Sequence, residues 1–164
     1  MRWLVILMTV TLSGCGPSWS DRSLNFISVE QARSLTDTDG TWLEPASTTV
    51  WVDGRNVERY TLGHIPGAIC MPLRSVDVQW RRVERAGTVI VYANTWNDPI
   101  ADALSKALLE RGIEHVKTLN GGWDAWIEAG GAQATGADSD LIEDASLRLQ
   151  RRTAEQRRGV TRRR

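Results

Sequence analysis

The two cysteines and two histidines are the side chains of this 164-residue sequence best suited to nucleophilic or metal chemistry. A Cys/His structural zinc site of four ligands is hard to build from so few residues. We therefore expect no metal site and no cofactor. Two cysteines also exclude a disulfide-rich scaffold. A reaction that uses a cysteine thiol is not excluded, and it depends on the sequence around each cysteine.

Cys15 follows a short positive start, Met1-Arg2, and an apolar run of about ten residues from Trp3 to Leu12. This run is too short to span a bilayer as a permanent helix. Its end, Leu12-Ser13-Gly14-Cys15, resembles the lipobox of bacterial lipoprotein signal peptides, in which the signal is cut before the cysteine and the thiol receives a diacylglycerol. The alternative is an ordinary secretory signal with a chance cysteine.

The lipobox resemblance implies a signal peptide over residues 1–14 and a tether over residues 15–25. Acyl chains on Cys15 would insert into a lipid bilayer, with each buried methylene adding roughly 0.8 kcal/mol. We therefore expect an exported lipoprotein, anchored to a membrane of a bacterial cell envelope on its periplasmic or extracytoplasmic face. A lipidated Cys15 would leave Cys70 without a disulfide partner in the chain.

Residues 26–131 alternate between strand and helix patterns. β-branched or continuously apolar runs predict buried parallel strands at 48–52, 68–71, 88–92 and 116–119, after a short apolar stretch at 25–27. Helices are predicted at 28–35, 56–61, 75–85, 99–111 and 123–129. This alternation with short connections predicts an α/β fold, with an open, mainly parallel sheet of about five strands and helices on both faces.

Local signals mark the helix ends and faces. Ser28 and Gln31 have the spacing of a capping box, and Asp98-Pro99 places an N-cap before a first-turn proline. The buried stripe of the helix that follows is predicted to be Ile100, Ala103, Leu104, Ala107 and Leu108, and Gly112 ends that helix. Val76, Trp80 and Val83 have the spacing of one face of the helix at 75–85.

The chain beyond residue 131 is interpreted as a linker over 132–139, followed by a helix and arginine-rich tail over 140–164. Arg148 to Arg164 contains eight arginines and one glutamate, whereas Cys15 to Leu147 contains eleven basic and nineteen acidic residues. The zero net charge therefore conceals an acidic body with a basic tail. Such a tail suits an anionic surface such as phospholipid, or the acidic body itself. A specific nucleic acid is a poor partner for an exported, acidic body.

Four motifs occur in order along the chain: Val52-Asp53-Gly54-Arg55, Gly63-His64-Ile65-Pro66-Gly67-Ala68-Ile69, Val89-Ile90-Val91-Tyr92 and Leu119-Asn120-Gly121-Gly122-Trp123-Asp124-Ala125-Trp126. Together they resemble the rhodanese-like domains of the sulfurtransferase family over about residues 26–131. The resemblance implies that most of these motif residues are architectural.

The resemblance assigns a structural role to each motif. Asp53 and Arg55 would tie a strand end to neighbouring loops, and His64, Pro66 and Gly67 would form a tight turn. Gly121 and Gly122 would let the backbone turn where a β-carbon would clash. The alternative for His64 is a general base. Trp123 and Trp126 favour core packing over ligand stacking, whereas Trp42 and Trp96 lie in loops and are the better candidates for a binding surface.

The loop after the strand at 88–92 reads Ala93-Asn94-Thr95-Trp96-Asn97-Asp98. The resemblance implies that an active member has a cysteine directly after this strand, which carries a persulfide inside a cradle of loop N–H groups. Ala93 stands there instead and has no thiol. Asp98 adds a carboxylate that, as N-cap, satisfies those amides itself. We therefore predict no catalytic residue in this loop and no ordinary rhodanese activity, and the same reasoning disfavours the phosphatase relatives.

Three functions are compatible with these features. The leading hypothesis is a catalytically silent, membrane-anchored binding or regulatory module that meets a protein or small molecule at the Ala93–Asp98 loop. The second is a sulfurtransferase or thiol-redox protein that uses Cys70, which lies near a strand end; the alternative for Cys70 is a buried small hydrophobe. The third is a peripheral binder of anionic surfaces through Arg148–Arg164.

Overall fold

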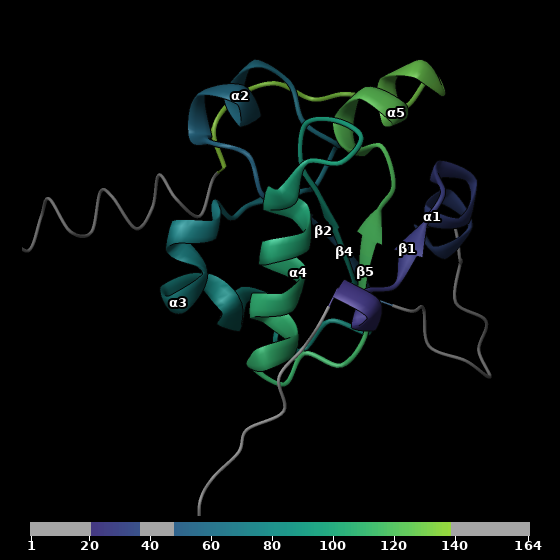
Figure 1. Ribbon diagram of the computed structural model, residues 1–164. Helices are drawn as coiled ribbons and strands as arrows, with labels where there is room; N and C mark the ends of the chain where they lie inside the picture. Colours follow the sequence, from purple (N-terminus) through teal and green to yellow (C-terminus); the bar gives the residue numbers. More distant parts are fainter. Residues whose placement is uncertain (1–20, 37–47, 139–164) are drawn as a thin grey trace, which may run out of the picture.

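The computed structural model describes residues 21–36 and 48–138 (Figure 1). At its centre lies a five-stranded sheet with the order β1-β5-β4-β2-β3, in which every neighbouring pair is parallel. The strands are β1 (Phe26–Ile27), β2 (Thr49–Asp53), β3 (Ile69–Cys70), β4 (Thr88–Tyr92) and β5 (Val116–Leu119). The predicted α/β fold with a parallel sheet of five strands is confirmed.

Helices cover both faces of the sheet. α1 (Val29–Thr36), α2 (Val57–Leu62) and α5 (Gly122–Glu128) contribute to one hydrophobic cluster, and α3 (Val76–Gln79) and α4 (Pro99–Glu110) contribute to the other (Figure 1). In β4, the side chains alternate between the two clusters, because successive residues of a strand point to opposite sides. All five residues of β4 are buried, as its continuous apolar run predicts.

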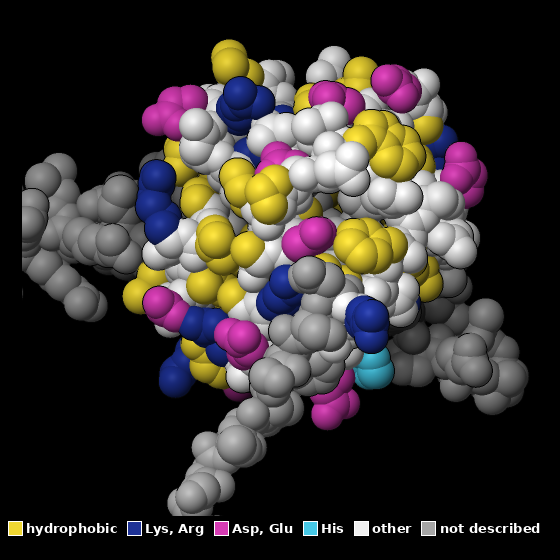
Figure 2. Space-filling view, in the orientation of Figure 1, with side chains coloured by type: hydrophobic (Ala, Val, Ile, Leu, Met, Phe, Trp, Pro, Cys, Tyr) yellow, Lys and Arg dark blue, Asp and Glu magenta, His cyan; other side chains and the backbone are white. Residues whose placement is uncertain are grey.

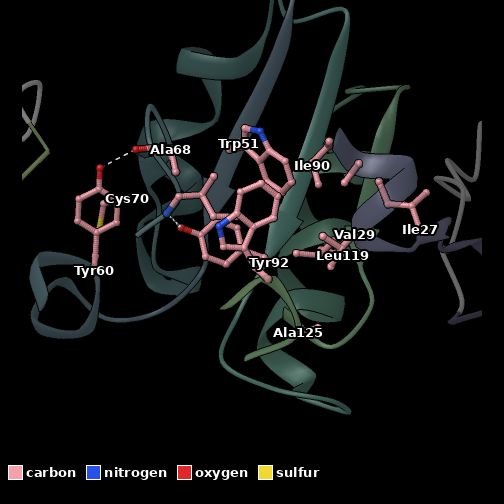
Figure 3. Packing of buried hydrophobic residues seen from close by; sticks show 13 residues of the cluster. Ile27, Val29, Trp51, Tyr60, Ala68, Cys70, Ile90, Tyr92, Leu119 and Ala125 are labelled. Atoms are coloured by element: carbon pink, nitrogen blue, oxygen red, sulfur yellow. Dashed lines mark hydrogen bonds between the residues drawn. The ribbon is translucent and has the colours of Figure 1, made fainter. Parts of the chain in front are cut away.

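Aromatic rings fill the centre of the first cluster. Trp51 from β2 meets Tyr92 from β4 edge to face, with ring centroids 6.2 Å apart (Figure 3). Trp51 also meets Trp126 from α5, at 5.2 Å between centroids. This packing holds α5 against the sheet close to the carboxyl ends of β2 and β4, where the loops that form the candidate site begin.

The two predicted helix caps, at Ser28 and Asp98, are confirmed. The Gln31 amide donates to Ser28 Oγ, and the Ser28 amide donates to the Gln31 side chain, which is the reciprocal capping box. Asp98 caps α4, with Pro99 at its first position.

The buried side of α4 is rotated relative to the prediction. Its buried residues are Ala101, Leu104, Ser105, Leu108 and Leu109, whereas Ile100, Ala103 and Ala107 are half-buried. The polar Ser105 faces inward because its hydroxyl is hydrogen-bonded to Thr118 of β5 at 2.9 Å. A pattern of apolar residues alone gives no sign of such a contact.

Residues 73–83 form three short helical pieces instead of the single helix expected at 75–85. These are η2 (Leu73–Ser75), α3 and η3 (Trp80–Val83), of which η2 and η3 are 3₁₀ turns. The inward side agrees with the prediction, since Val76 and Val83 are buried and Trp80 is half-buried.

Residues 132–138, assigned to a linker on sequence grounds, are hydrogen-bonded to the domain. His64 and Ala134 exchange two backbone hydrogen bonds, and the Gly136 amide donates to the Thr61 carbonyl. Asp138 accepts from the Cys70 amide at 2.8 Å and pairs with Arg82 at 2.9 Å. The 132–138 segment therefore runs beside α2 and the edge strand β3.

Several sequence predictions lie outside the described residues. They are the signal peptide, most of the tether with Cys15, the loop with Trp42, and the helix and tail over 140–164. Within residues 21–36 and 48–138, no helix has the length and apolar character needed to cross a membrane.

Candidate ligand-binding site

The loop from Ala93 to Asp98 packs against the start of α5. The Ala93 carbonyl accepts from the Trp123 amide at 2.8 Å, and the Asn94 carbonyl accepts from the Asp124 amide at 2.9 Å. This close approach needs Gly122, which has φ +57° and whose added β-carbon would lie 2.7 Å from the Ala93 carbonyl oxygen. The Trp123 and Asp124 amides at the start of α5 are therefore bonded to the loop and are not directed at a ligand.

The Asp98 carboxylate lies in the turn of the same loop. Its Oδ1 accepts from the Ile100 amide at 3.0 Å, and its Oδ2 accepts from the Asn94 amide at 3.1 Å and from the Asn94 side chain at 2.8 Å. Burial opposes ionisation, but these hydrogen bonds and the charge of Arg59 hold the pKa of Asp98 below its ordinary value. An anion at the start of α4 would meet a negative charge and amides that are already bonded.

Asp98→Ala should lower the free energy of unfolding at pH 7 by about 1 kcal/mol, because it removes the cap of α4. The folded pKa of Asp98 is depressed, so its charge contributes stability above the ordinary value of 3.8 and loses that contribution as the pH falls through the folded pKa. Urea unfolding of both proteins from pH 7 to pH 3 should show the difference shrinking. A difference that stays constant would contradict the assigned role of the charge.

Trp96 is the exposed aromatic residue of this loop, with 53% of its surface accessible. Its indole lies over Gly121, where an added β-carbon would come within 2.8 Å of the ring. One side of the indole is therefore fixed against the α5 start, while about half of the side chain faces solvent. This placement agrees with the expectation that Trp96 contributes to a surface and not to the core.

Asp53 and Arg55 form a buried ion pair between β2 and α2. Arg55 Nη2 lies 2.7 Å from Asp53 Oδ2, and their side chains are 4% and 0% exposed. Arg55 also donates to the Gly63 carbonyl, and its guanidinium lies over the Trp123 ring at 4.6 Å from the centroid. The pair joins the end of β2 to the α2 end and to α5.

A pocket of about 520 Å³ lies beside the loop, between α2, the start of α5 and the 132–138 segment. Its walls combine cationic, acidic, amide, aromatic and apolar groups, supplied by Arg55, Arg59, Leu62, Asn94, Trp123 and Asp124. Arg59 from α2 donates to the Asn94 side chain at 2.6 Å, which connects the two sides of the pocket. Leu62 is 80% exposed and adds an apolar group to the wall. This mixture suits binding of an anionic group attached to an apolar body.

His64 and Trp126 lie outside the pocket wall and are held by structural contacts. The His64 ring is buried and stacks on Tyr60 at 3.9 Å between centroids, and its Nδ1 lies 2.9 Å from the Tyr60 carbonyl oxygen. Trp126 is buried, and its indole N–H donates to the Ala132 carbonyl. The Ala68 amide donates to the Ile65 carbonyl across Pro66 and Gly67, which closes the turn before β3.

Cys70 lies in β3 with no exposed surface (Figure 3). Burial, and then the nearby charges of Asp53 and Asp138, raises the pKa of its thiol to about 12. The side chain is packed in the first hydrophobic cluster with Tyr60 and Ala68. These contacts favour the buried small hydrophobe over the relocated nucleophile.

In a Cys15→Ser variant, Cys70 is the sole thiol and should react very slowly with an aromatic disulfide reagent. A pKa of about 12 against an ordinary 9.0 lowers the thiolate fraction at pH 8 by about 1000-fold. Burial should slow the folded protein further. The same protein in denaturant gives the reference rate. Equal rates in the two states would make Cys70 an accessible thiol.

Arg59 and Gln133 belong to the pocket but were not singled out from the sequence. Arg59 meets Asn94 across 35 positions of the chain, because β2 and β4 are neighbours in the sheet. The strand order would have indicated that the segments after these two strands lie together. Gln133 belongs to the 132–138 segment, and no sequence pattern indicated that this segment lies beside the pocket. Trp123, expected in the core, is half-buried and also lines the pocket.

Comparison with known proteins decides the family. The family model described as "Rhodanese-like domain" matches residues 38–129, more than half of the chain. The chain belongs to the rhodanese-like domain family. The parallel sheet and the helices on its two faces are those of a rhodanese-like domain.

Solved structures agree with this assignment. The rhodanese-like domain of the Alr3790 protein from Anabaena is 29% identical, with a TM-score of 0.55, 69% of this chain covered and 86% of that chain covered. The BH2092 protein from Bacillus halodurans matches at a TM-score of 0.58 with 21% identity, covering 70% and 79%. A protein of unknown function from Rhodopseudomonas palustris, described as a possible tyrosine phosphatase, matches at 0.56 with 18% identity, covering 79% and 100%. The last two likenesses show the shared fold.

Proposed function

We propose that this protein is a lipid-anchored rhodanese-like domain that does not transfer sulfur and instead binds a partner at the pocket beside the Ala93–Asp98 loop. The proposal rests on the Ala93–Asp98 loop, where a carboxylate takes up amides that could otherwise bind a sulfur anion. The family resemblance aligns Ala93 with the cysteine of active members, and the Asp98 carboxylate accepts the amide hydrogen bonds of Asn94 and Ile100. Both the nucleophile and the room for a sulfur anion are thereby lost.

The chemistry of the pocket supports binding without turnover. Persulfide transfer needs a thiolate, and the lining residues include no cysteine. They offer the Arg59 guanidinium for an anionic group, the Trp123 ring for an apolar or aromatic group, and the exposed Leu62 as a further apolar contact. The exposed half of Trp96 extends this surface along the loop. A protein segment that carries a carboxylate next to an apolar side chain fits these features.

Membrane attachment is the second part of the proposal. It rests on Leu12-Ser13-Gly14-Cys15, and it predicts that the mature chain starts at Cys15 with a diacylglycerol on its thiol. Mass spectrometry of the protein isolated from a membrane fraction should show the acyl groups on Cys15. A Cys15→Ser variant should leave the membrane fraction.

Sulfur transfer from thiosulfate to cyanide tests the loss of activity. The natural sequence should match the Cys70→Ala variant at the background rate. Ala93→Cys alone should gain little, because Asp98 still occupies the loop amides and disfavours a thiolate beside it. Adding Asp98→Ser keeps a capping oxygen while removing the charge, and it should raise the rate about tenfold or more above Ala93→Cys. Activity of the natural sequence that disappears in Cys70→Ala would overturn the proposal.

Photo-crosslinking in cells tests the binding role. A photoreactive amino acid at Thr95, in the pocket wall, should give a defined adduct with a partner. The same amino acid at the exposed Glu114 is the matched control. Arg59→Glu should abolish the Thr95 adduct, because it reverses the charge offered to the partner. An adduct that is unchanged in Arg59→Glu would remove the pocket from the binding surface.

A further inference from the structure

The exposed side of the helical segment from Leu73 to Arg85 carries basic and apolar residues that no role described above uses. Arg74, Val78, Arg81 and Arg85 are spaced by four, three and four positions along the short helical pieces and the turn that follows η3. All four are exposed, and Val78 has 73% of its surface accessible. The opposite side is turned to the sheet, because Val76 and Val83 are buried. We refer to these four residues as the arginine stripe.

Few acidic groups compensate the charge of the stripe. Asp77 forms an ion pair with Arg111 of the α4 end, and Arg82 pairs with Asp138, so these charges are balanced locally. Glu84 is the remaining acidic residue of the segment, against the three arginines of the stripe. The Arg81 guanidinium lies over the ring of Trp80 at 5.4 Å from its centroid. Figure 2 shows basic, acidic and hydrophobic side chains side by side over the lower left of the molecule, where α3 lies.

Both ends of the described domain lie on this side of the sheet. Leu24 packs against the second hydrophobic cluster, which also holds Val76 and Val83. Asp138 is ion-paired with Arg82 of η3. The six peptide links between Cys15 and Asp21 can span at most about 20 Å. A lipid on Cys15 would thus hold this side near a bilayer.

We propose that the arginine stripe contacts the anionic phospholipid of the membrane to which the domain is anchored. The inference rests on the proposed lipid at Cys15. Arginines near a negatively charged bilayer each favour contact by about fivefold, so three give on the order of 100-fold. Val78 and Leu73, of which Leu73 is 37% exposed, add apolar surface at the headgroup level. The contact fixes the orientation of the domain and directs the pocket, which lies between α2 and α5, away from the lipid.

The test uses the full lipidated protein in phosphatidylcholine vesicles with and without phosphatidylglycerol. A fluorophore is attached to Val78→Cys, or to Ile127→Cys on α5 as the control position, and quenching by a nitroxide on the lipid headgroup is measured. Both positions are exposed, whereas Cys70 is buried and inert. Quenching at 78 should exceed that at 127 several-fold in anionic vesicles only, and high salt should remove the difference.

Two triple variants distinguish an effect of the arginine charges from an effect on folding. Replacing Arg74, Arg81 and Arg85 by glutamate should reduce quenching at 78 to the level at 127, whereas replacing them by lysine should preserve it. Equal quenching at 78 and 127, or quenching at 78 that survives charge reversal, would overturn the inference. Flotation with the vesicles is measured on the same samples. Failure to float in phosphatidylcholine would refute the lipid anchor, while flotation without quenching at 78 would refute the stripe alone.

Discussion

Arg55→Ala should lower the free energy of unfolding by about 3–5 kcal/mol, because it leaves the Asp53 carboxylate without its cation at a site with no exposed surface. The loss should be measured by urea unfolding at pH 7, followed by circular dichroism. Arg55 also contacts Tyr92 and Trp123, so its removal loosens the contact between β2, β4 and α5. The same substitution at the exposed Arg74 should change stability by less than about 0.5 kcal/mol.

A double-mutant cycle assigns this loss to the ion pair. Asp53→Asn with Arg55→Met removes both charges while keeping similar volumes, so no charge stays buried alone. The double variant should therefore lose clearly less stability than the sum of the losses in the single variants Asp53→Asn and Arg55→Met. Losses that simply add would show that the two charges are not energetically coupled in the folded protein.

Gly122→Ala should cost about 2–4 kcal/mol. The added β-carbon would lie 2.7 Å from the Ala93 carbonyl oxygen, and the residue has φ +57°. The methyl group would press the Ala93 loop away from α5 and would weaken the hydrogen bonds of Trp123 and Asp124 to that loop. Thermal and urea unfolding of the variant should both show the loss.

Gly112→Ala provides the control for backbone conformation. Gly112 also has positive φ, +83°, but an added β-carbon there would meet no atom within 4 Å. We expect this variant to lose about 1–2 kcal/mol from the left-handed conformation alone. The additional loss in Gly122→Ala then measures the close approach to Ala93. If the two variants lose the same amount, the loop does not press on α5.

The strands and caps were predictable where one local signal was enough. The run at 88–92 is buried on both sides, so its continuous apolar sequence identified β4, and Asp98-Pro99 identified the start of α4. Features that depend on a second element were not predictable. The inward Ser105 depends on Thr118, and the short helical pieces at 73–83 have no capping side chain to mark their boundaries. The strand expected at 68–71 pairs only over Ile69–Cys70.

In the candidate site, too, features with a local signal were predictable and features that combine separate segments were not. The loop after β4 could be identified from six consecutive residues, and Asp98 accepts from the Ile100 amide, as expected of an N-cap. The pocket could not be foreseen, because its wall combines Arg59, Trp123 and Gln133 from three separate segments. From the sequence alone, each of these residues looks like an ordinary surface or core residue of its own segment. The sheet order places the segments after β2, β4 and β5 close together, and the 132–138 segment adds Gln133.

The contact of Asp138 with the Cys70 amide has a consequence for self-association. β3 is an edge strand of two residues, and β1 at the opposite edge is equally short. Unpaired edges can recruit strands from other chains into aggregates. At β3, the outward amide of Cys70 is already bonded to a carboxylate, and the backbone of His64 is paired with Ala134. A foreign strand would have to displace the contact at Cys70, so the 132–138 segment protects the β3 edge from edge-to-edge growth.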